Sequence, residues 1–221
     1  VMLYFNEPDK SGHLFGPDSK QTMEAIIKAD RIFGRLLRGL KGHSLDPDII
    51  VVSDHGMKNI DRDKVIIVDD FMNIADSLKV YGSGPLMQID ISFKSKIMRK
   101  NILSALYSIP NMLGYEKHYF PKKHHFINRN SGDFILLPEP GWLIFTRDQL
   151  KKTNMLKKDL KGMHGWLAED EEMHGVFLAA GPQIRNGSNI ASFENTAIYG
   201  IIADLLNLEP YSYEKYPDGA R

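Results

Sequence analysis

Blocks of apolar and polar residues along the chain predict a mixed α/β protein. The opening run Val1–Phe5 is apolar and favours extended backbone, which predicts a buried strand. The polar residues 6–13 that follow predict a loop. Apolar residues at steps of three and four predict an amphipathic helix over residues 19–40, after a turn and helix cap at residues 16–19. The β-branched run at residues 48–52 is typical of a central parallel strand. Strand, helix and strand together predict a βαβ unit.

The middle of the chain has shorter elements. Residues 58–78 are interpreted as a strand or loop followed by a short helix around 69–77. From about residue 80 to residue 147 the pattern predicts a small inserted α+β lobe, with strands at 86–93, 133–137 and 142–145 and a helix at 96–108. The basic and aromatic stretch at residues 115–125 is interpreted as a solvated hairpin, with contact to an anionic ligand as the alternative.

The pattern of the main sheet returns near the end of the chain. Residues 175–180 predict another buried strand, which ends at Gly181-Pro182. Residues 195–208 predict a helix, and the tail from residue 210 to residue 221 predicts irregular structure. The whole pattern therefore predicts a central β-sheet flanked by helices, with the small α+β insertion beside it.

Composition narrows the possible functions. The chain has 221 residues, of which 43% are hydrophobic and 25% charged, as expected of a soluble globular protein. Its 28 basic and 28 acidic residues balance, so no overall field attracts a nucleic-acid polymer. Because there are no cysteines, histidine and carboxylate are the only strong ligands for a transition metal.

The ends and the surface of the chain give weaker indications. No apolar run is long enough to span a membrane, and no signal sequence opens the chain. Because the first residues already predict a buried strand, we expect the chain to be an internal or C-terminal piece of a longer protein. Asn186-Gly187-Ser188 is a glycosylation sequon, a hint of secretion.

Polar clusters lie next to the predicted strands. In an open α/β sheet, ligands bind outside the carboxyl ends of the strands. Asp9 and His13 follow the first predicted strand, and Asp54 and His55 follow the second. His164 lies in a glycine-bracketed loop ahead of the strand at 175, so two carboxylates and three imidazoles can meet at one edge of the sheet. Because zinc takes about four ligands, this number suits two divalent cations better than one, and paired cations suit phosphoryl transfer. Spacing alone does not exclude the other histidines, which are His43, His118, His124, His125 and His174.

Three motifs resemble one known family. Residues 4–17 resemble the EPD-x-x-GH-x-x-GP signature of the nucleotide pyrophosphatase/phosphodiesterase family. Residues 51–57 resemble its second motif, and residues 162–166 with 173–182 resemble its third, in the family's order. The chain departs from the family pattern at three places. Asn6 occupies a position that is often acidic in the family, Trp166 occupies one that is usually Tyr, and Ala168-Glu169 replaces the common Asp-Asn. The resemblance covers nearly the whole chain.

The resemblance implies an alkaline-phosphatase-like fold and cleavage of phosphodiester or pyrophosphate bonds by two zinc ions and a threonine nucleophile. Asp9, His13 and His164 match the ligands of one zinc, and Asp54 and His55 match two ligands of the other. The family's threonine and a further aspartate lie upstream of the first motif, so their counterparts are expected outside this chain. The first motif argues against a related phosphomutase.

Two functions follow from the resemblance. The chain is either the C-terminal portion of the catalytic domain of a zinc-dependent phosphodiesterase, which needs the N-terminal half of that domain, or a catalytically inactive remnant that binds a metal or a nucleotide. In both cases this chain alone is expected to be inactive. The substrate is a nucleotide or another phosphodiester, including lipids. The resemblance implies a secreted or membrane-anchored ectoenzyme.

Overall fold

The computed structural model describes residues 1–74, 78–92, 95–152 and 160–209. These residues form two compact units. Unit 1 consists of Val1–Ile32 and His55–His174, and unit 2 consists of Phe33–Asp54 and Gly175–Arg221.

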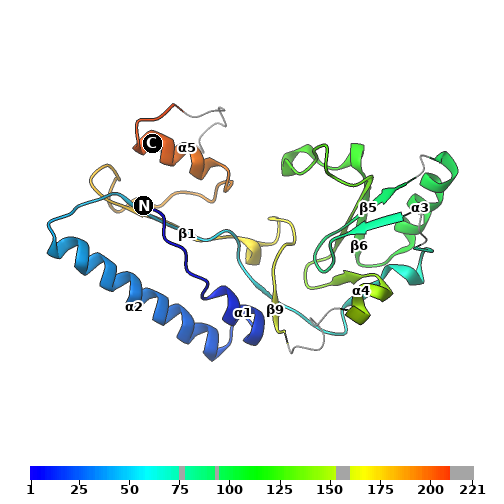
Figure 1. Cartoon of the computed structure of the whole chain (residues 1–221), viewed down its shortest axis with the longest axis horizontal. Helices are drawn as coiled ribbons and strands as arrows, with labels where there is room; N and C mark the ends of the chain where they lie inside the picture. The colour runs from blue at the N-terminus through cyan, green and yellow to red at the C-terminus, as the bar shows by residue number, and fades with distance from the viewer. Residues whose placement is uncertain (75–77, 93–94, 153–159, 210–221) are drawn as a thin grey trace. The chain divides into compact units, whose positions relative to one another are not determined.

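Unit 1 contains a four-stranded antiparallel sheet. Its strands lie in the order β4 (Leu78–Tyr81), β5 (Met87–Ile91), β7 (Phe134–Pro138) and β6 (Met112–Glu116). Helix α3 (Lys96–Ser108) packs beside the sheet and contacts β6 (Figure 1). Its first turn is capped by the Ser95 hydroxyl, which accepts a hydrogen bond from the Met98 backbone N–H at 3.3 Å.

Strand β7 is buried on both faces of the sheet. Phe134 and Leu136 point into a cluster with Ile102 and Leu106 of α3, and all four are at most 4% exposed. The alternate residues Ile135 and Leu137 pack against Phe120 in a second cluster. The continuous apolar run at β7 therefore reflects a strand covered by a layer on each side.

A third cluster holds together the short strands of unit 1. Strand β3 (Val65–Ile67) pairs in parallel with β8 (Leu143–Phe145), and β2 (Lys58–Asn59) pairs antiparallel with β9 (Gly162–Met163). The buried residues of this cluster are Leu143, Phe145, Met163, Trp166 and Met173. The remaining short helices are α4 (Arg147–Lys152) and the 3₁₀ turns Val68–Asp70, Lys117–Tyr119, Lys122–His124 and Glu171–Met173.

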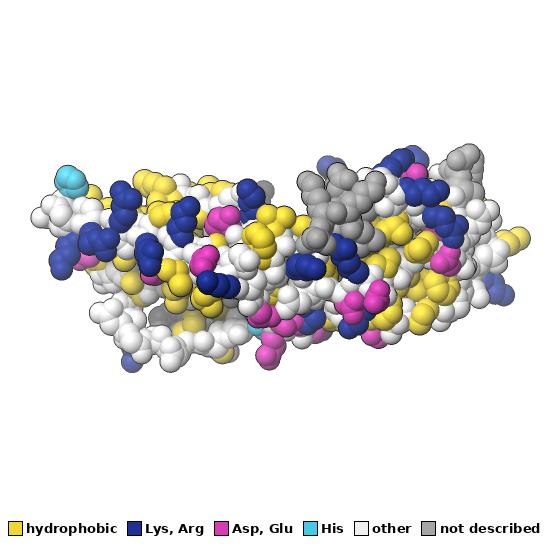
Figure 2. All heavy atoms as spheres, turned by 90° about the horizontal axis from the view of Figure 1, so that it is seen from below, with side chains coloured by type: hydrophobic (Ala, Val, Ile, Leu, Met, Phe, Trp, Pro, Cys, Tyr) yellow, Lys and Arg dark blue, Asp and Glu magenta, His cyan; other side chains and the backbone are white. Residues whose placement is uncertain are grey.

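Two helices open the chain. Helix α1 (Asp9–Phe15) ends at Gly16, whose φ of +90° suits glycine. Helix α2 (Lys20–Gly42) follows, and the Ser19 hydroxyl accepts a hydrogen bond from the Thr22 backbone N–H, as the predicted cap requires. The apolar residues of α2 stay partly exposed, with Met23 at 55%. Figure 2 shows hydrophobic side chains at the surface among Lys and Arg side chains.

Unit 2 has little covered apolar surface. Strand β1 (Ile49–Val52) pairs antiparallel with β10 (Phe177–Ala180) in a two-stranded ribbon, and helix α5 (Ala197–Leu205) follows. Val52 is 47% exposed and Leu178 is 61% exposed. The ribbon is therefore half-open to solvent.

Three expectations for these segments were wrong. Residues 1–5 form no strand and are exposed, because no strand among the described residues pairs with them. Residues 9–13, expected in a loop, lie in α1. Strand β1 is antiparallel to its partner and only partly buried, so the expected βαβ unit with a central parallel strand is absent from the described residues.

Other expectations agree with the structure. The helix at 96–108 has the predicted bounds, and strands β5, β7, β8 and β10 lie within or next to the predicted ranges. Strands β4 and β6 were missed. Residues 115–125 form the end of β6 and two 3₁₀ turns rather than a hairpin, and Phe120 is buried. Around 69–77 the described part holds only the 3₁₀ turn, and residues 75–77 and 93 and the tail from 210 lie outside the described residues.

Candidate metal centre

Helix α1 places the first two candidate ligands on one face. Asp9 and His13 are four residues apart, so they lie one turn apart on the same side of the helix. The Asp9 Oδ1 atom lies 3.5 Å from His13 Nε2. The helix that was read as a loop is thus what brings these two side chains together.

Strand β9 contacts α1 and leads directly into the third candidate ligand, His164. His13 Nδ1 donates a hydrogen bond to the Gly162 carbonyl at 2.9 Å, and the Lys161 backbone N–H donates to the His13 carbonyl at 2.8 Å. A Cβ on Gly162 would lie 2.3 Å from the Gly12 carbonyl oxygen, so this close approach requires glycine at position 162. His164 follows β9 directly, which places it beside α1.

The three side chains form a compact group of ligand atoms. One ligand atom from each of Asp9, His13 and His164 lies within 4.8 Å of the other two. Asp9 Oδ1 is 3.5 Å from His13 Nε2 and 3.8 Å from His164 Nε2. Ligands at about 2.0–2.2 Å from a tetrahedral zinc lie about 3.3–3.6 Å apart, so these separations are close to that geometry.

Two observations show that the group fits a cation. Asp9 Oδ1 is itself buried and has no hydrogen-bond partner among the described residues. Since the Gly162 carbonyl can only accept, Nδ1 of His13 carries the ring proton, and in the neutral ring Nε2 presents a lone pair towards Asp9. A carboxylate oxygen and a lone pair that face each other need positive charge between them. Two imidazoles and one carboxylate are a usual ligand set for catalytic zinc, with one position left open.

The other two predicted ligands lie outside this group. The His55 ring stacks on His164, with centroids 3.4 Å apart and planes 11° apart, and its Nδ1 donates to the Gly56 carbonyl at 2.8 Å. Asp54 is exposed, lies two residues after the end of β1, and belongs to unit 2. The structure therefore brings together four of the five side chains in unit 1, and three of them converge as ligands.

The remaining histidines of the described part lie outside the group. His124 lies 3.7 Å from Glu169, and His174 Nε2 hydrogen-bonds the Ala168 carbonyl at 2.8 Å. His118 and His125 are exposed. Among the described residues, the three-membered group of Asp9, His13 and His164 is the one that the geometry selects.

A further cluster of charged residues, centred on Lys58, is not indicated by the motifs of the sequence. Lys58 on β2 forms ion pairs with Asp170 and Glu172, and its hydrogen bond to Glu172 raises the Lys58 pKa against the opposing effect of burial. The lysine and the two acids are more than 110 residues apart in sequence, so no local pattern links them.

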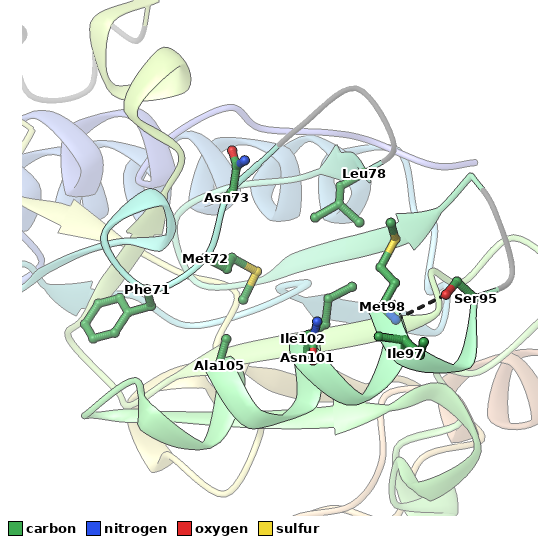
Figure 3. A pocket seen from close by; sticks show the side chains of 10 residues that line it. All are labelled: Phe71, Met72, Asn73, Leu78, Ser95, Ile97, Met98, Asn101, Ile102 and Ala105. Atoms are coloured by element: carbon green, nitrogen blue, oxygen red, sulfur yellow. Dashed lines mark hydrogen bonds between the residues drawn. The ribbon is translucent and has the colours of Figure 1, made fainter.

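A pocket elsewhere in unit 1 has a different chemistry. It encloses about 580 Å³ between the segment before β4 and helix α3, and Figure 3 shows Met72, Leu78 and Met98 among the side chains around it. Among the described residues its lining contains none of the predicted ligands and no titratable side chain. The described part of the lining therefore offers apolar contacts, two side-chain amides and a hydroxyl.

Comparison with known proteins identifies the family. The sequence model for type I phosphodiesterase / nucleotide pyrophosphatase matches residues 1–167. A venom phosphodiesterase of Naja atra is 31% identical over 217 residues, which cover 94% of this chain and 25% of the relative. The chain spans about a quarter of the length of the first curated relatives.

Solved structures of the same family have a similar fold. Human ectonucleotide pyrophosphatase / phosphodiesterase 5 superposes with a TM-score of 0.83 at 27% identity, over 96% of this chain and 55% of that one. An inactive variant of the murine protein, in complex with AMP, gives 0.82 at 28% identity, with the same coverage. These matches confirm the predicted α/β, alkaline-phosphatase-like fold. The chain belongs to the type I phosphodiesterase / nucleotide pyrophosphatase family.

Proposed function

We propose that this chain supplies the principal zinc ligands of an enzyme that hydrolyses phosphodiester or pyrophosphate bonds. Asp9, His13 and His164 would hold one zinc, and Asp54 and His55 would supply two ligands to a second. The observation that carries the proposal is the buried Asp9 Oδ1, which lacks a hydrogen bond and faces the Nε2 atoms of two histidines. Family membership supports the reaction class.

Contacts within the chain would orient the imidazole rings of the proposed site. The Gly162 carbonyl holds the proton of His13 on Nδ1, which orients Nε2 for ligation. Stacking fixes the His55 ring parallel to His164. When bound, paired zinc ions activate an attacking oxygen and neutralise charge on the transferred phosphoryl group.

The second zinc shell and the nucleophile would come from further polypeptide. Two ligands are fewer than the three that catalytic zinc usually takes from protein. We propose that the missing aspartate and the threonine nucleophile belong to an N-terminal half of the catalytic domain. Exposed apolar side chains in unit 2 support such a partner, since Val176 is 56% exposed and Leu178 is 61% exposed. Without that partner we expect the chain to be inactive.

A nucleotide is the substrate that we favour over a lipid phosphodiester. The AMP complex of the murine relative supports this choice. A nucleic-acid polymer is not expected to bind through overall charge, because the net charge is zero. We propose that the insertion at about residues 80–147 supplies no metal ligand, because its histidines lie outside the three-ligand group.

We propose a secreted or membrane-anchored location. The word "ectonucleotide" in the names of the structural relatives and the venom origin of another relative support it. Asn186 of the sequon is exposed, as an acceptor for a glycan must be. The described residues include no helix long and apolar enough to cross a membrane.

Activity of the intact gene product tests the proposal. His13→Ala and Asp54→Asn should each abolish hydrolysis of the nitrophenyl ester of thymidine monophosphate at saturating zinc, because each removes a ligand of a different ion. His118→Ala, at an exposed histidine outside the group, is the matched control and should keep full activity.

Two results would change the assignment. Turnover above about a tenth of wild type in either ligand variant would contradict it, since even residues that only orient ligands typically contribute about 10- to 100-fold. Zinc binding by an intact product that hydrolyses no phosphodiester would favour the alternative, an inactive metal- or nucleotide-binding relative.

A further inference from the structure

Lys58 lies at the centre of an ion cluster that joins β2 to the turn at Glu171–Met173. Its Nζ lies 3.1 Å from Asp170 Oδ2 and also pairs with Glu172. The Lys58 side chain is 24% exposed and that of Asp170 is 12% exposed, so the pair is largely shielded from water. Asp170 also stabilises the turn directly, because its Oδ1 accepts a hydrogen bond from the Glu172 backbone N–H at 3.2 Å.

The Lys58 ammonium is needed to balance a buried charge. Asp170 Oδ2 is buried and makes no hydrogen bond with the described residues, so the nearby ammonium is its compensation. Removing one partner of a shielded ion pair leaves the other charge uncompensated and costs far more than the loss of an exposed pair. The turn should therefore shift if Lys58 loses its charge.

The same turn holds the backbone that carries His55. The Gly56 backbone N–H donates to the Met173 carbonyl at 2.9 Å. A Cβ on Gly56 would lie 2.0 Å from the Glu172 carbonyl oxygen, so the two segments are in close backbone contact. Because His55 Nδ1 bonds to the Gly56 carbonyl, a shift of the turn reaches the His55 ring through Gly56.

Lys58 is also joined to the second histidine. It pairs with Met163 in the β2–β9 ladder, and His164 is the next residue along the chain. Met163 is 8% exposed and lies in the same buried cluster as Met173, so β9 and the turn pack against the same core. Lys58 thus contacts both segments that hold the stacked pair of His55 and His164, which are β9 and the turn at Glu171–Met173.

We propose that Lys58 is a positioning residue which, through Asp170 and Glu172, fixes the stacked rings of His55 and His164 for metal binding. Its value for catalysis rests on the proposed function above, whereas its effect on the two rings does not. Lys58 is not one of the predicted ligands. Its contribution is to limit the movement of two imidazoles whose ligand atoms must stay within a few tenths of an ångström of a productive geometry.

The test uses three variants of the full 221-residue chain. Lys58→Met keeps the length of the side chain and removes its charge, Lys58→Arg restores the charge, and Glu172→Gln removes only the more exposed acid. Lys152→Met is the matched control, because Lys152 forms an exposed ion pair with Asp148 within α4, at another place in unit 1. Zinc affinity is measured by calorimetry, and the imidazole signals of zinc-free protein are measured by NMR.

For Lys58→Met we expect zinc affinity to fall about 10-fold, the size typical of a lost residue behind the ligands. We also expect the imidazole signals of His55 and His164 to move in zinc-free protein while those of His118 stay. Arginine should restore both readouts, Glu172→Gln should give a smaller effect in the same direction, and Lys152→Met should change neither.

The outcomes separate this proposal from the proposed function. Unchanged imidazole signals in both Lys58→Met and Glu172→Gln would overturn the role of Lys58. If wild type binds no zinc, the proposed function fails, and the imidazole signals of zinc-free protein still decide whether Lys58 positions the rings. If Lys58→Met does not fold, Glu172→Gln and Lys58→Arg give the answer.

Discussion

The four-stranded sheet of unit 1 and the β1–β10 ribbon of unit 2 come from similar sequence patterns and differ in burial. Leu136 of β7 is fully buried, whereas Leu178 of β10 is 61% exposed. Strand β7 has neighbours on both edges and side-chain clusters on both faces, while β1 and β10 pair only with each other among the described residues. A continuous apolar run therefore shows what a strand is able to bury, and the surrounding layers determine whether it does so.

The largest expected difference between the two regions is in the cost of removing a leucine. Leu136→Ala should lower the free energy of unfolding by about 2–5 kcal/mol, because it leaves a cavity between the sheet and α3. Leu178→Ala should change it by less than about 0.5 kcal/mol, because the side chain is mostly in water. Urea unfolding followed by circular dichroism measures both, and equal costs would contradict the difference in packing.

Helix α3 of unit 1 and helix α5 of unit 2 should respond differently to loss of the hydroxyl group at their N-caps. Ser95→Ala removes the hydrogen bond to Met98 and should cost about 1 kcal/mol. Thr196→Ala should cost nothing measurable through capping, because the Thr196 side chain makes no capping hydrogen bond to α5. Thermal unfolding of the two variants checks this, and a penalty at Thr196 as large as that at Ser95 would refute the assignment of the caps.

The smallest change in unfolding free energy is expected for Glu169, at the surface of unit 1. A hydrogen bond from Lys123 to the Glu169 carboxylate lowers the pKa of Glu169, and the carboxyl group is half-exposed. A lowered folded-state pKa means that the pair stabilises the fold above the unfolded pKa and loses this contribution as pH falls through the folded value. Glu169→Gln should cost under about 1 kcal/mol at neutral pH.

Acid should then remove the difference between Glu169→Gln and wild type. Unfolding free energies of both proteins, measured from neutral pH down to about pH 3, provide the check. A gap between them that widened as pH fell would show that the Glu169 carboxyl is not stabilised by Lys123.

Local sequence signals predicted the elements whose partners lie close by. The helix at α3 begins after a capping serine and keeps a regular apolar face, so its bounds were predictable. Helix α1 was not, because Pro8 and Gly12 give a short polar segment the appearance of a loop. Residues 1–5 have the composition of a strand, but pairing depends on a neighbour that composition does not reveal.

The candidate site was predictable in its residue types and not in its geometry. The family motifs selected Asp9, His13 and His164, which the structure brings together, although the strand expected at residues 1–5 before Asp9 and His13 is absent. The stacking of His55 on His164 and the role of Lys58 depend on contacts between segments about 110 residues apart. Only the folded chain brings those segments into contact.

The central claim is that Asp9, His13 and His164 form one good zinc site in this chain, and zinc titration tests it most directly. Calorimetry of the metal-free, folded 221-residue chain at neutral pH should show one tight zinc equivalent and a second that is much weaker, since Asp54 and His55 are only two ligands. Asp9→Asn should abolish the tight equivalent, while His118→Ala should keep it. Two equally tight sites, or a tight equivalent that survives Asp9→Asn, would contradict the account.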